Sequence, residues 1–253
     1  MKSLTDALNA KQQALKPRGK FSFKSRKTAV TNTTSDTKPS THTETQEPQQ
    51  QKTETKAPEN SMTVRGITSK RWTLQHQEPP ERSLSSVDVL IDQCHDDVID
   101  LTTTSIQIAA LHLTQLHRCV ILCAPVQGSV LIEGCRECIL VLACHQFRMH
   151  HSVHVDVYLH ISSHPIIEDC NHVRFGVYAV RGMDERLTKA GLNKDENQYD
   201  RVDDFNWLKT QPSPHWQLLA TNVLDWTPLQ CEDEQQCLNE MRSRLPSIVP
   251  ENP

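Results

Sequence analysis

One short run near the middle of the chain places three side chains that could do chemistry at alternate positions. Gln146, Arg148 and His150 stand at i, i+2 and i+4, so in an extended strand all three point to the same face. Glu168 follows about one structural repeat later and could lie beside Arg148, where a carboxylate would orient the guanidinium or hydrogen-bond a partner. A lone outward arginine is commonly a solvated surface residue. These residues alone therefore leave a functional Arg148 and a surface Arg148 both open.

Four of the nine cysteines have a spacing that superficially suits zinc, as the pairs Cys119–Cys123 and Cys135–Cys138. If Cys119 and Cys123 lie on one extended strand, their Cα atoms are about 13 Å apart at about 3.3 Å per residue. That separation is too large for thiolates bound at about 2.3 Å from one metal ion. Both pairs lie near aliphatic residues, where free cysteine packs as a small hydrophobe. We therefore expect stacked, buried cysteines and no metal site.

The histidines of the same region lack the arrangement of a catalytic or metal site. They are His145, His150, His151 and His154. No helical pattern or Glu-Xaa-Xaa-His motif would bring two of them together, and in a strand they alternate between faces, so we expect exposed surface histidines. The chain also has no glycine-rich phosphate-binding motif and only seven glycines. We therefore predict no nucleotide site and no cofactor.

Short apolar runs without a helical stripe fill the stretch 86–180. Cys119, Cys138, Val155 and Val173 begin or lie in successive runs of this kind, at nearly equal steps along the chain. A repeat of roughly 18 residues with two or three short strands predicts a mainly β chain, folded as a right-handed parallel β-helix of about five coils. An antiparallel sandwich is the alternative, but the Asn-Gly and Asp-Gly turn pairs typical of its hairpins are absent from the sequence.

The end of a β-helix exposes apolar strand edges and needs a cap. Residues 183–200 are polar and predict a loop, whereas residues 201–226 hold three of the four tryptophans. Residues 232–245 have a helical pattern, with acidic residues in the first turn and arginines in the last. We expect this tract to form a C-terminal capping loop and helix.

The two ends of the chain differ in charge. Residues 1–86 contain 15 Lys and Arg against 8 Asp and Glu, whereas residues 87–253 contain 12 against 23. We divide the chain into a basic, partly helical segment over 1–27, a disordered linker over 28–71, and a β-helix domain with its cap over 72–245. The basic tail would suit nucleic acid, anionic lipid or an acidic protein, or it serves solubility alone.

Targeting signals are missing from the sequence. No apolar run reaches the roughly 18 residues of a spanning helix, and the start of the chain has neither a signal-peptide apolar stretch nor the glycine required for myristoylation. An odd number of cysteines without a secretory signal also argues against a disulfide scaffold. We therefore expect a protein of the reducing cytosol with no membrane anchor.

Three separate runs together resemble the tubulin-folding cofactor C family, the C-CAP/cofactor C-like proteins. This β-helix domain is shared with the retinitis pigmentosa 2 protein and, more distantly, with cyclase-associated proteins. The runs are 146–150 (Gln-Phe-Arg-Met-His), 162–170 (Ser-Ser-His-Pro-Ile-Ile-Glu-Asp-Cys) and 203–208 (Asp-Asp-Phe-Asn-Trp-Leu). The resemblance covers roughly residues 75–245, and the order of the three motifs makes it specific. Residues 19–24 (Gly-Lys-Phe-Ser-Phe-Lys) also resemble the basic stretch that precedes the linker in this family.

The resemblance implies a domain that activates GTP hydrolysis in another protein by supplying an arginine. The family's catalytic arginine falls on Arg148, and Gln146, Glu168 and Phe205 fall on positions expected to line the GTPase contact. The implied target is GTP-bound β-tubulin, held with tubulin-folding cofactors D and E, or an Arf-like small GTPase as for the retinitis pigmentosa 2 protein. The chain would then be a GTPase-activating cofactor and not itself an enzyme, and its action would release the native α/β-tubulin heterodimer.

The resemblance carries further expectations and one departure. It implies a cytoplasmic monomer of the microtubule cytoskeleton that needs no nucleic acid, metal or cofactor. A non-catalytic β-helix module that binds actin or tubulin is the alternative from another class, and such a module has no need of an outward arginine near Gln146 and Glu168. Family members are expected to begin with a helical bundle. The segment 1–60 here predicts only one short helix, over 3–15, followed by the linker.

Overall fold

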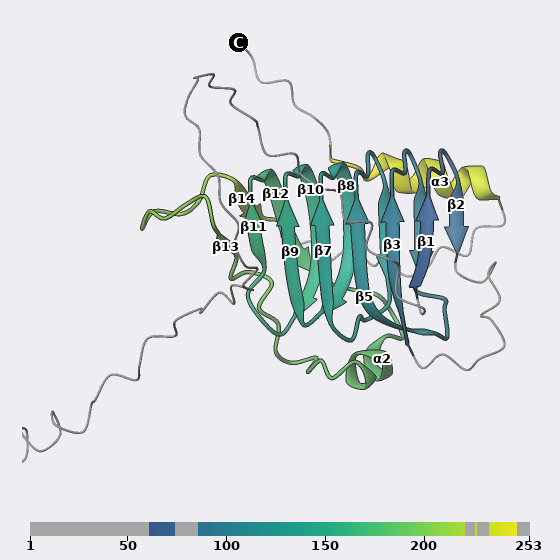
Figure 1. The fold of residues 1–253 in the computed structure, drawn as a ribbon, viewed down its shortest axis with the longest axis horizontal. Helices are drawn as coiled ribbons and strands as arrows, with labels where there is room; N and C mark the ends of the chain where they lie inside the picture. Colours follow the sequence, from purple (N-terminus) through teal and green to yellow (C-terminus); the bar gives the residue numbers. More distant parts are fainter. Residues whose placement is uncertain (1–60, 74–85, 221–225, 227–232, 247–253) are drawn as a thin grey trace, which may run out of the picture. The chain divides into compact units, whose positions relative to one another are not determined.

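The structure is a computed structural model that describes residues 61–73, 86–220, 226 and 233–246 (Figure 1). The expectations for the basic segment over 1–27, its short helix, and the linker up to residue 60 lie outside these residues. No helix within the described part of the chain is long and apolar enough to cross a membrane.

The described strands form two parallel sheets of seven strands each. The odd-numbered strands make one sheet, here called the odd sheet: β1 (Ser61–Arg65), β3 (Ser86–Asp92), β5 (Gln107–Thr114), β7 (Ser129–Glu133), β9 (Gln146–His150), β11 (Ile166–Glu168) and β13 (Asp203–Asp204). The even-numbered strands make the other, here called the even sheet: β2 (Arg71–Thr73), β4 (Val98–Leu101), β6 (Val120–Cys123), β8 (Arg136–Cys144), β10 (Val153–Ile161), β12 (Asn171–Val177) and β14 (Trp216–Leu218). Successive strands alternate between the sheets, so the chain winds as a β-helix with two strands per coil.

The strand register confirms the repeat that the sequence predicts. Val155 pairs with Cys138 on one side and with Val173 on the other, so these three residues stack as their spacing along the chain indicates. Val120 pairs with Ile139, which reproduces the predicted step from Cys119 to Cys138. The five coils expected between residues 86 and 180 are β3–β4 through β11–β12.

The six corners from β1–β2 through β11–β12 each use two residues with left-handed backbone, three positions apart. The first is a glycine at Gly66 and Gly134 but a larger residue elsewhere, as at Gln93, Gln115, His151 and Asp169. Backbone bonds to the next coil fix these strained positions, for example from the N–H of Gln115 to the carbonyl of Glu133 (2.9 Å). The corners therefore need few glycines, which is why a glycine-poor chain can build a solenoid.

The coil interior is narrow and filled by aliphatic residues and cysteines, and its last coil is closed by larger side chains. Tyr199, Val202 and Trp216 pack against the end of this core. They belong to the tract that the sequence assigns to a capping loop.

The even sheet is covered on its outer face by the C-terminal helix. Helix α3 (Glu234–Ser243) begins where the Asp233 side chain accepts a hydrogen bond from the Gln235 N–H, so the helix predicted over 232–245 is confirmed. Leu238 and Met241 of α3 pack in one buried cluster with residues of β4, β6 and β8, and Trp226 is fully buried in the same cluster. In Figure 1, α3 runs alongside the strands near β1 to β8.

Two stretches differ from the sequence prediction. The polar stretch 183–200, expected to be a loop, begins with helix α2 (Asp184–Lys189), which is anchored by the buried Leu187 and by bonds from Arg186 to the carbonyls of Thr102 and Thr104. Strand β1 and the first residue of β2 lie within the range assigned to the linker, so the β-helix begins before the expected residue 72. Both strands are short and partly exposed, so they carry little periodic signal, and pairing with β3 and β4 stabilises them.

Candidate functional site

Arg148 lies at the centre of β9 and points away from the core of the odd sheet. Its register partners are Leu131 on β7 and Ile166 on β11, so no carboxylate stands directly opposite it. Arg148 is exposed, and within the described residues no hydrogen bond or ion pair engages its guanidinium. The odd sheet therefore presents, between two aliphatic side chains, a guanidinium that has no hydrogen-bond or ion-pair partner among the described residues.

The residues on either side of Arg148 hold its strand in place. Phe147 and Met149 point inward and are 1% and 0% exposed. Phe147 meets Phe175 of the even sheet edge-to-face, with ring centroids 6.0 Å apart. Since both inward neighbours are fixed in the core, the backbone that carries Arg148 is a rigid element.

Glu168 lies on the same outer face as Arg148, two residues beyond Ile166, which stands opposite Arg148. The residue opposite Glu168 is His150, whose Nδ1 is 3.2 Å from the Glu168 carboxylate. Glu168 thus pairs with His150 and is diagonal to Arg148, so it leaves the guanidinium free. The sequence could not distinguish these two arrangements, because both follow from the same alternation of side chains.

The other two predicted contact residues share this face. Gln146 is exposed and stands opposite Ser129, two residues before Arg148 on β9. Phe205 follows β13 directly, its N–H bonds the carbonyl of Ile167 (3.0 Å), and it is 51% exposed. The structure therefore brings Gln146, Arg148, Glu168 and Phe205 together on the odd sheet, across strands β9, β11 and β13.

Sequence reasoning missed Leu131 as part of this face. It is 38% exposed and is one of the few large apolar side chains that the described residues leave open to solvent. The alternation of side chains along the run Ser129–Glu133 could have predicted this exposure, because Val130 and Ile132 on either side of Leu131 are buried. Assigning the face required the register of β7 against β9, which only the structure supplies.

The histidines near the site are engaged with the fold more than the sequence predicted. His145 contacts the carbonyl of Ala190 (2.7 Å) and the hydroxyl of Ser162 (3.0 Å). His151, which is exposed as expected, lies between Glu133 (2.8 Å) and Asp169 (3.5 Å). The expectation of exposed surface histidines therefore holds for His151 and is wrong for His145, His150 and His154, which are half-buried. Within the described residues no group of three or more His, Cys, Asp or Glu side chains could hold a metal ion.

Seven of the eight cysteines in the described residues pack inside the solenoid, as the sequence predicted, and the eighth, Cys237, is buried on α3. Cys119 and Cys138 lie in the core and point their thiols at backbone carbonyls, those of Cys94 and His117 for Cys119 and those of Leu116 and Arg136 for Cys138. Burial raises the pKa of Cys94 to about 11 and the pKa of Cys135 to about 12. These groups remain neutral thiols near pH 7 and act as packing residues.

We predict that these thiols react slowly in the folded protein. The thiolate is the nucleophile, and a pKa raised by two to three units lowers its population about 100- to 1,000-fold. With Cys231, which lies outside the described residues, replaced by serine, a thiol reagent should label the native chain at least about 100-fold more slowly than the urea-unfolded chain. Fast labelling of a native cysteine would contradict the burial of these stacked cysteines.

The same burial predicts how stability depends on pH. Above about pH 9 the thiols of the unfolded chain ionise before those of the folded chain, so the free energy of unfolding should fall.

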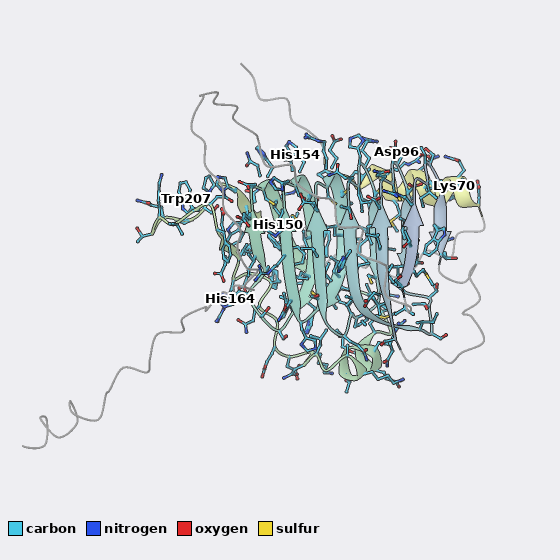
Figure 2. All side chains as sticks on the ribbon, viewed as in Figure 1. Lys70, Asp96, His150, His154, His164 and Trp207 are labelled. Carbon is cyan, nitrogen blue, oxygen red and sulfur yellow. The ribbon has the colours of Figure 1, made fainter. Side chains whose placement is uncertain are left out.

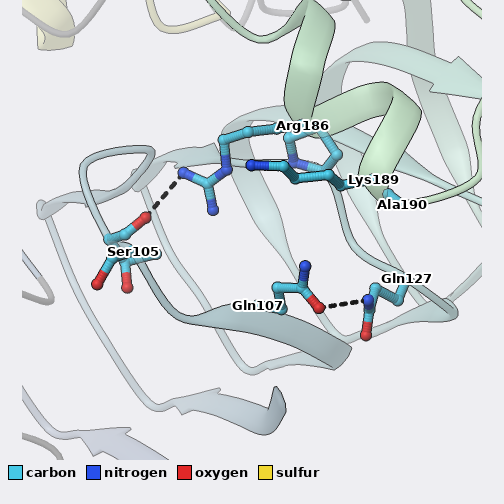
Figure 3. Close-up of a pocket in the computed structure, with 8 residues that line it drawn as sticks. Ser105, Gln107, Gln127, Arg186, Lys189 and Ala190 are labelled. Atoms are coloured by element: carbon cyan, nitrogen blue, oxygen red, sulfur yellow. Dashed lines mark hydrogen bonds between the residues drawn. The ribbon is translucent and has the colours of Figure 1, made fainter. Parts of the chain in front are cut away.

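A surface cavity beside α2 is an alternative candidate site (Figure 3). Its lining includes Arg186, Lys189, Gln107 and Gln127. The Arg186 guanidinium bonds backbone carbonyls of the loop 102–106, and the two glutamine amides bond each other (2.6 Å). Because its main polar groups already serve the fold, this cavity is a weaker candidate than the face around Arg148.

The sequence of this chain is similar to known proteins that share one family name. Residues 86–205 match the family model described as tubulin binding cofactor C. The tubulin-specific chaperone C of Mus musculus is 33% identical over 232 residues, which are 88% of this chain and 64% of that protein. The tubulin-folding cofactor C of Arabidopsis thaliana is 44% identical over 131 residues, which are 51% of this chain and 36% of that protein.

One solved structure, Tubulin Binding Cofactor C from Leishmania major, is 26% identical, with a TM-score of 0.40 over 64% of this chain and 89% of that chain. The chain spans about a third to two thirds of the length of the two curated relatives above. The family match covers the five central coils and reaches Phe205, so it includes all four predicted site residues. By this match and these relatives, residues 86–205 form a domain of the tubulin binding cofactor C family.

Proposed function

We propose that this protein is a tubulin-folding factor that activates GTP hydrolysis by β-tubulin, with Arg148 as an arginine finger. The observation that carries the proposal is the state of Arg148, which is exposed on a rigid strand and has no partner among the described residues. The names of the relatives, tubulin-specific chaperone C and tubulin-folding cofactor C, supply the class of partner.

The physical role of such an arginine follows from the charge that hydrolysis develops. Water attacks the γ-phosphorus, the bond to the β–γ bridging oxygen breaks, and negative charge grows on the bridging and γ-oxygens. A guanidinium that enters a site from which water is excluded stabilises this charge and needs no proton transfer of its own. Nucleotide and water belong to the partner, so the chain contributes only the positive charge and its positioning.

The surroundings of Arg148 suit insertion into a partner. The aliphatic neighbours Leu131 and Ile166 would exclude water around the guanidinium once a partner covers them, which strengthens its electrostatic effect. Because Glu168 is engaged by His150, docking need not break a salt bridge to Arg148. In this proposal Gln146, Glu168 and Phe205 form the polar and apolar contacts around the finger.

In this role the protein works within a folding complex. It acts as a monomer on GTP-bound β-tubulin held with tubulin-folding cofactors D and E, and hydrolysis accompanies release of the native α/β-tubulin heterodimer. Such a role belongs in the cytoplasm, at the microtubule cytoskeleton.

The experiment that tests the proposal is single-turnover hydrolysis of GTP bound to tubulin, with cofactors D and E present and the full chain added or omitted. We expect the chain to accelerate hydrolysis and the acceleration to saturate with chain concentration. Acceleration of an Arf-like GTPase alone would move the target from tubulin to that class. Binding to tubulin without acceleration of either protein would contradict the activator function and favour a non-catalytic binding module.

A further inference from the structure

The loop between β13 and β14, residues 205–213, projects beyond the end of the odd sheet. Figure 1 shows it as the green hairpin-like excursion past β13, and Figure 2 labels Trp207 on it. At its tip Leu208 is 94% exposed, the most exposed of the large apolar side chains in the described residues. The loop begins with Phe205, so two apolar groups follow each other from the sheet outward.

A buried carboxylate holds the base of this loop. The side chain of Asp204 is only 4% exposed, and it lies 2.6 Å from Nδ1 of His215. The same carboxylate accepts hydrogen bonds from the Ser213 hydroxyl and from the N–H of Asn206 (2.9 Å). Both ends of the loop are thereby fastened to one side chain.

Further contacts fix the loop between its ends. The Asn206 amide and Asp169 exchange hydrogen bonds, one of them from Asn206 Nδ2 to the Asp169 carboxylate (2.9 Å). The Trp207 indole N–H donates to the carbonyl of Gln211 (2.7 Å), and the Lys209 ammonium lies 4.3 Å from the indole centroid. These bonds engage the polar groups and leave Leu208 without packing, so the loop presents an apolar side chain at little further entropic cost.

The position of the loop relative to Arg148 identifies what it meets. Arg148 and Phe205 are two strands apart, which is about 10 Å at roughly 4.8 Å per strand. A standard interface buries about 800 Å² per partner, equivalent to a disc of about 16 Å radius. A globular partner centred on Arg148 therefore also covers Phe205 and reaches the loop.

We propose that Leu208 is an apolar anchor that inserts into a hydrophobic pocket on the GTP-binding protein that receives Arg148. The Asp204–Ser213–His215 cluster pre-organises the loop for this contact. The inference rests on the proposed function, because it takes the partner to be the one that Arg148 enters. The proposed contact gives the Asp-Asp-Phe-Asn-Trp-Leu motif a role in binding, which the role of Arg148 alone does not explain.

Binding and hydrolysis measured separately test this inference. The probe is GTP-loaded αβ-tubulin with cofactors D and E present, titrated with the labelled full chain to obtain a Kd and then a hydrolysis rate at saturation. Leu208→Ser should raise the Kd about 10- to 100-fold, as for an anchor residue at an interface, and leave the saturating rate unchanged. Leu218→Ser is the matched control, since Leu218 is an exposed leucine (48%) of the even sheet and its replacement should leave the Kd unchanged. Leu208→Met should bind nearly as well as the wild type.

A second variant tests pre-organisation without touching the apolar tip. Asn206→Ala removes the reciprocal bonds to Asp169 and should raise the Kd several-fold, with faster hydrogen exchange at the loop amides. If Leu208→Ser binds with the wild-type Kd, the proposal that Leu208 is an anchor is wrong. The activator function is tested separately, by the hydrolysis assay. Weaker binding by Leu208→Ser, together with equal hydrolysis by wild type and Arg148→Ala, would support the anchor and contradict the arginine finger.

Discussion

Replacing Arg148 with alanine should lower the saturating rate of GTP hydrolysis on tubulin by about 10³- to 10⁵-fold relative to the wild-type chain, provided that Arg148 is the finger. This loss corresponds to about 4–7 kcal/mol of barrier. The effect should appear in the rate and not in the Kd, because the guanidinium acts chiefly where charge develops during the reaction. The measurement is single-turnover hydrolysis with cofactors D and E, at chain concentrations that saturate binding.

Two variants control for charge and for folding. Arg148→Lys keeps the charge but loses the planar fork of donors, so it should recover only a small part of the activity. Arg136→Ala removes another exposed arginine, at the start of β8 in the even sheet, and should keep the wild-type rate. Equal rates for Arg148→Ala and Arg136→Ala would show that Arg148 is only a surface residue.

Phe147→Ala should have the largest effect on stability among residues next to the site. Phe147 is 1% exposed and packs against Phe175 across the coil. Truncation of a buried phenylalanine removes apolar burial and leaves a cavity, so the free energy of unfolding should fall by about 3–5 kcal/mol. Urea unfolding followed by tryptophan fluorescence measures this change.

The control for Phe147 is its exposed neighbour on the same strand. Gln146→Ala should change the free energy of unfolding by no more than about 0.5 kcal/mol, because its side chain lies on the surface. If Phe147→Ala and Gln146→Ala destabilise equally, the inward and outward assignments along β9 are wrong. The position of Arg148 on the outer face would then lose its support.

The sequence predicted the central coils well because their signal is local and repeated. Short aliphatic runs recur at nearly equal steps along the chain, and the register of β6, β8, β10 and β12 follows those steps. The ends of the solenoid carry a weaker signal. Strands β1, β2, β13 and β14 are short, and their place in the fold depends on pairing with a neighbouring coil.

Packing between segments that are distant along the chain could not be predicted from the sequence. The burial of Trp226 against Tyr158 and the bonds of Arg186 to the carbonyls of Thr102 and Thr104 depend on tertiary contacts that leave no local pattern. For the same reason α2 was expected to be a loop.

The face around Arg148 was predictable in part. Alternation along β9 put Gln146, Arg148 and His150 on one side, and the resemblance added Glu168 and Phe205. The pairing of Glu168 with His150 and the exposure of Leu131 depend on register between coils. The cluster around Asp204 joins residues up to eleven positions apart through an irregular loop, for which periodicity gives no guide.

The most direct test of the central claim is whether Arg148 recognises the transition state. GDP with aluminium fluoride mimics the phosphoryl group in transfer, and transition-state analogues bind at least about 100-fold more tightly than substrates when a catalytic group engages them. We predict that the wild-type chain binds tubulin at least about tenfold more tightly with this analogue than with GDP alone, and that Arg148→Ala binds both states equally. The same preference for the analogue in Arg148→Ala would contradict the account.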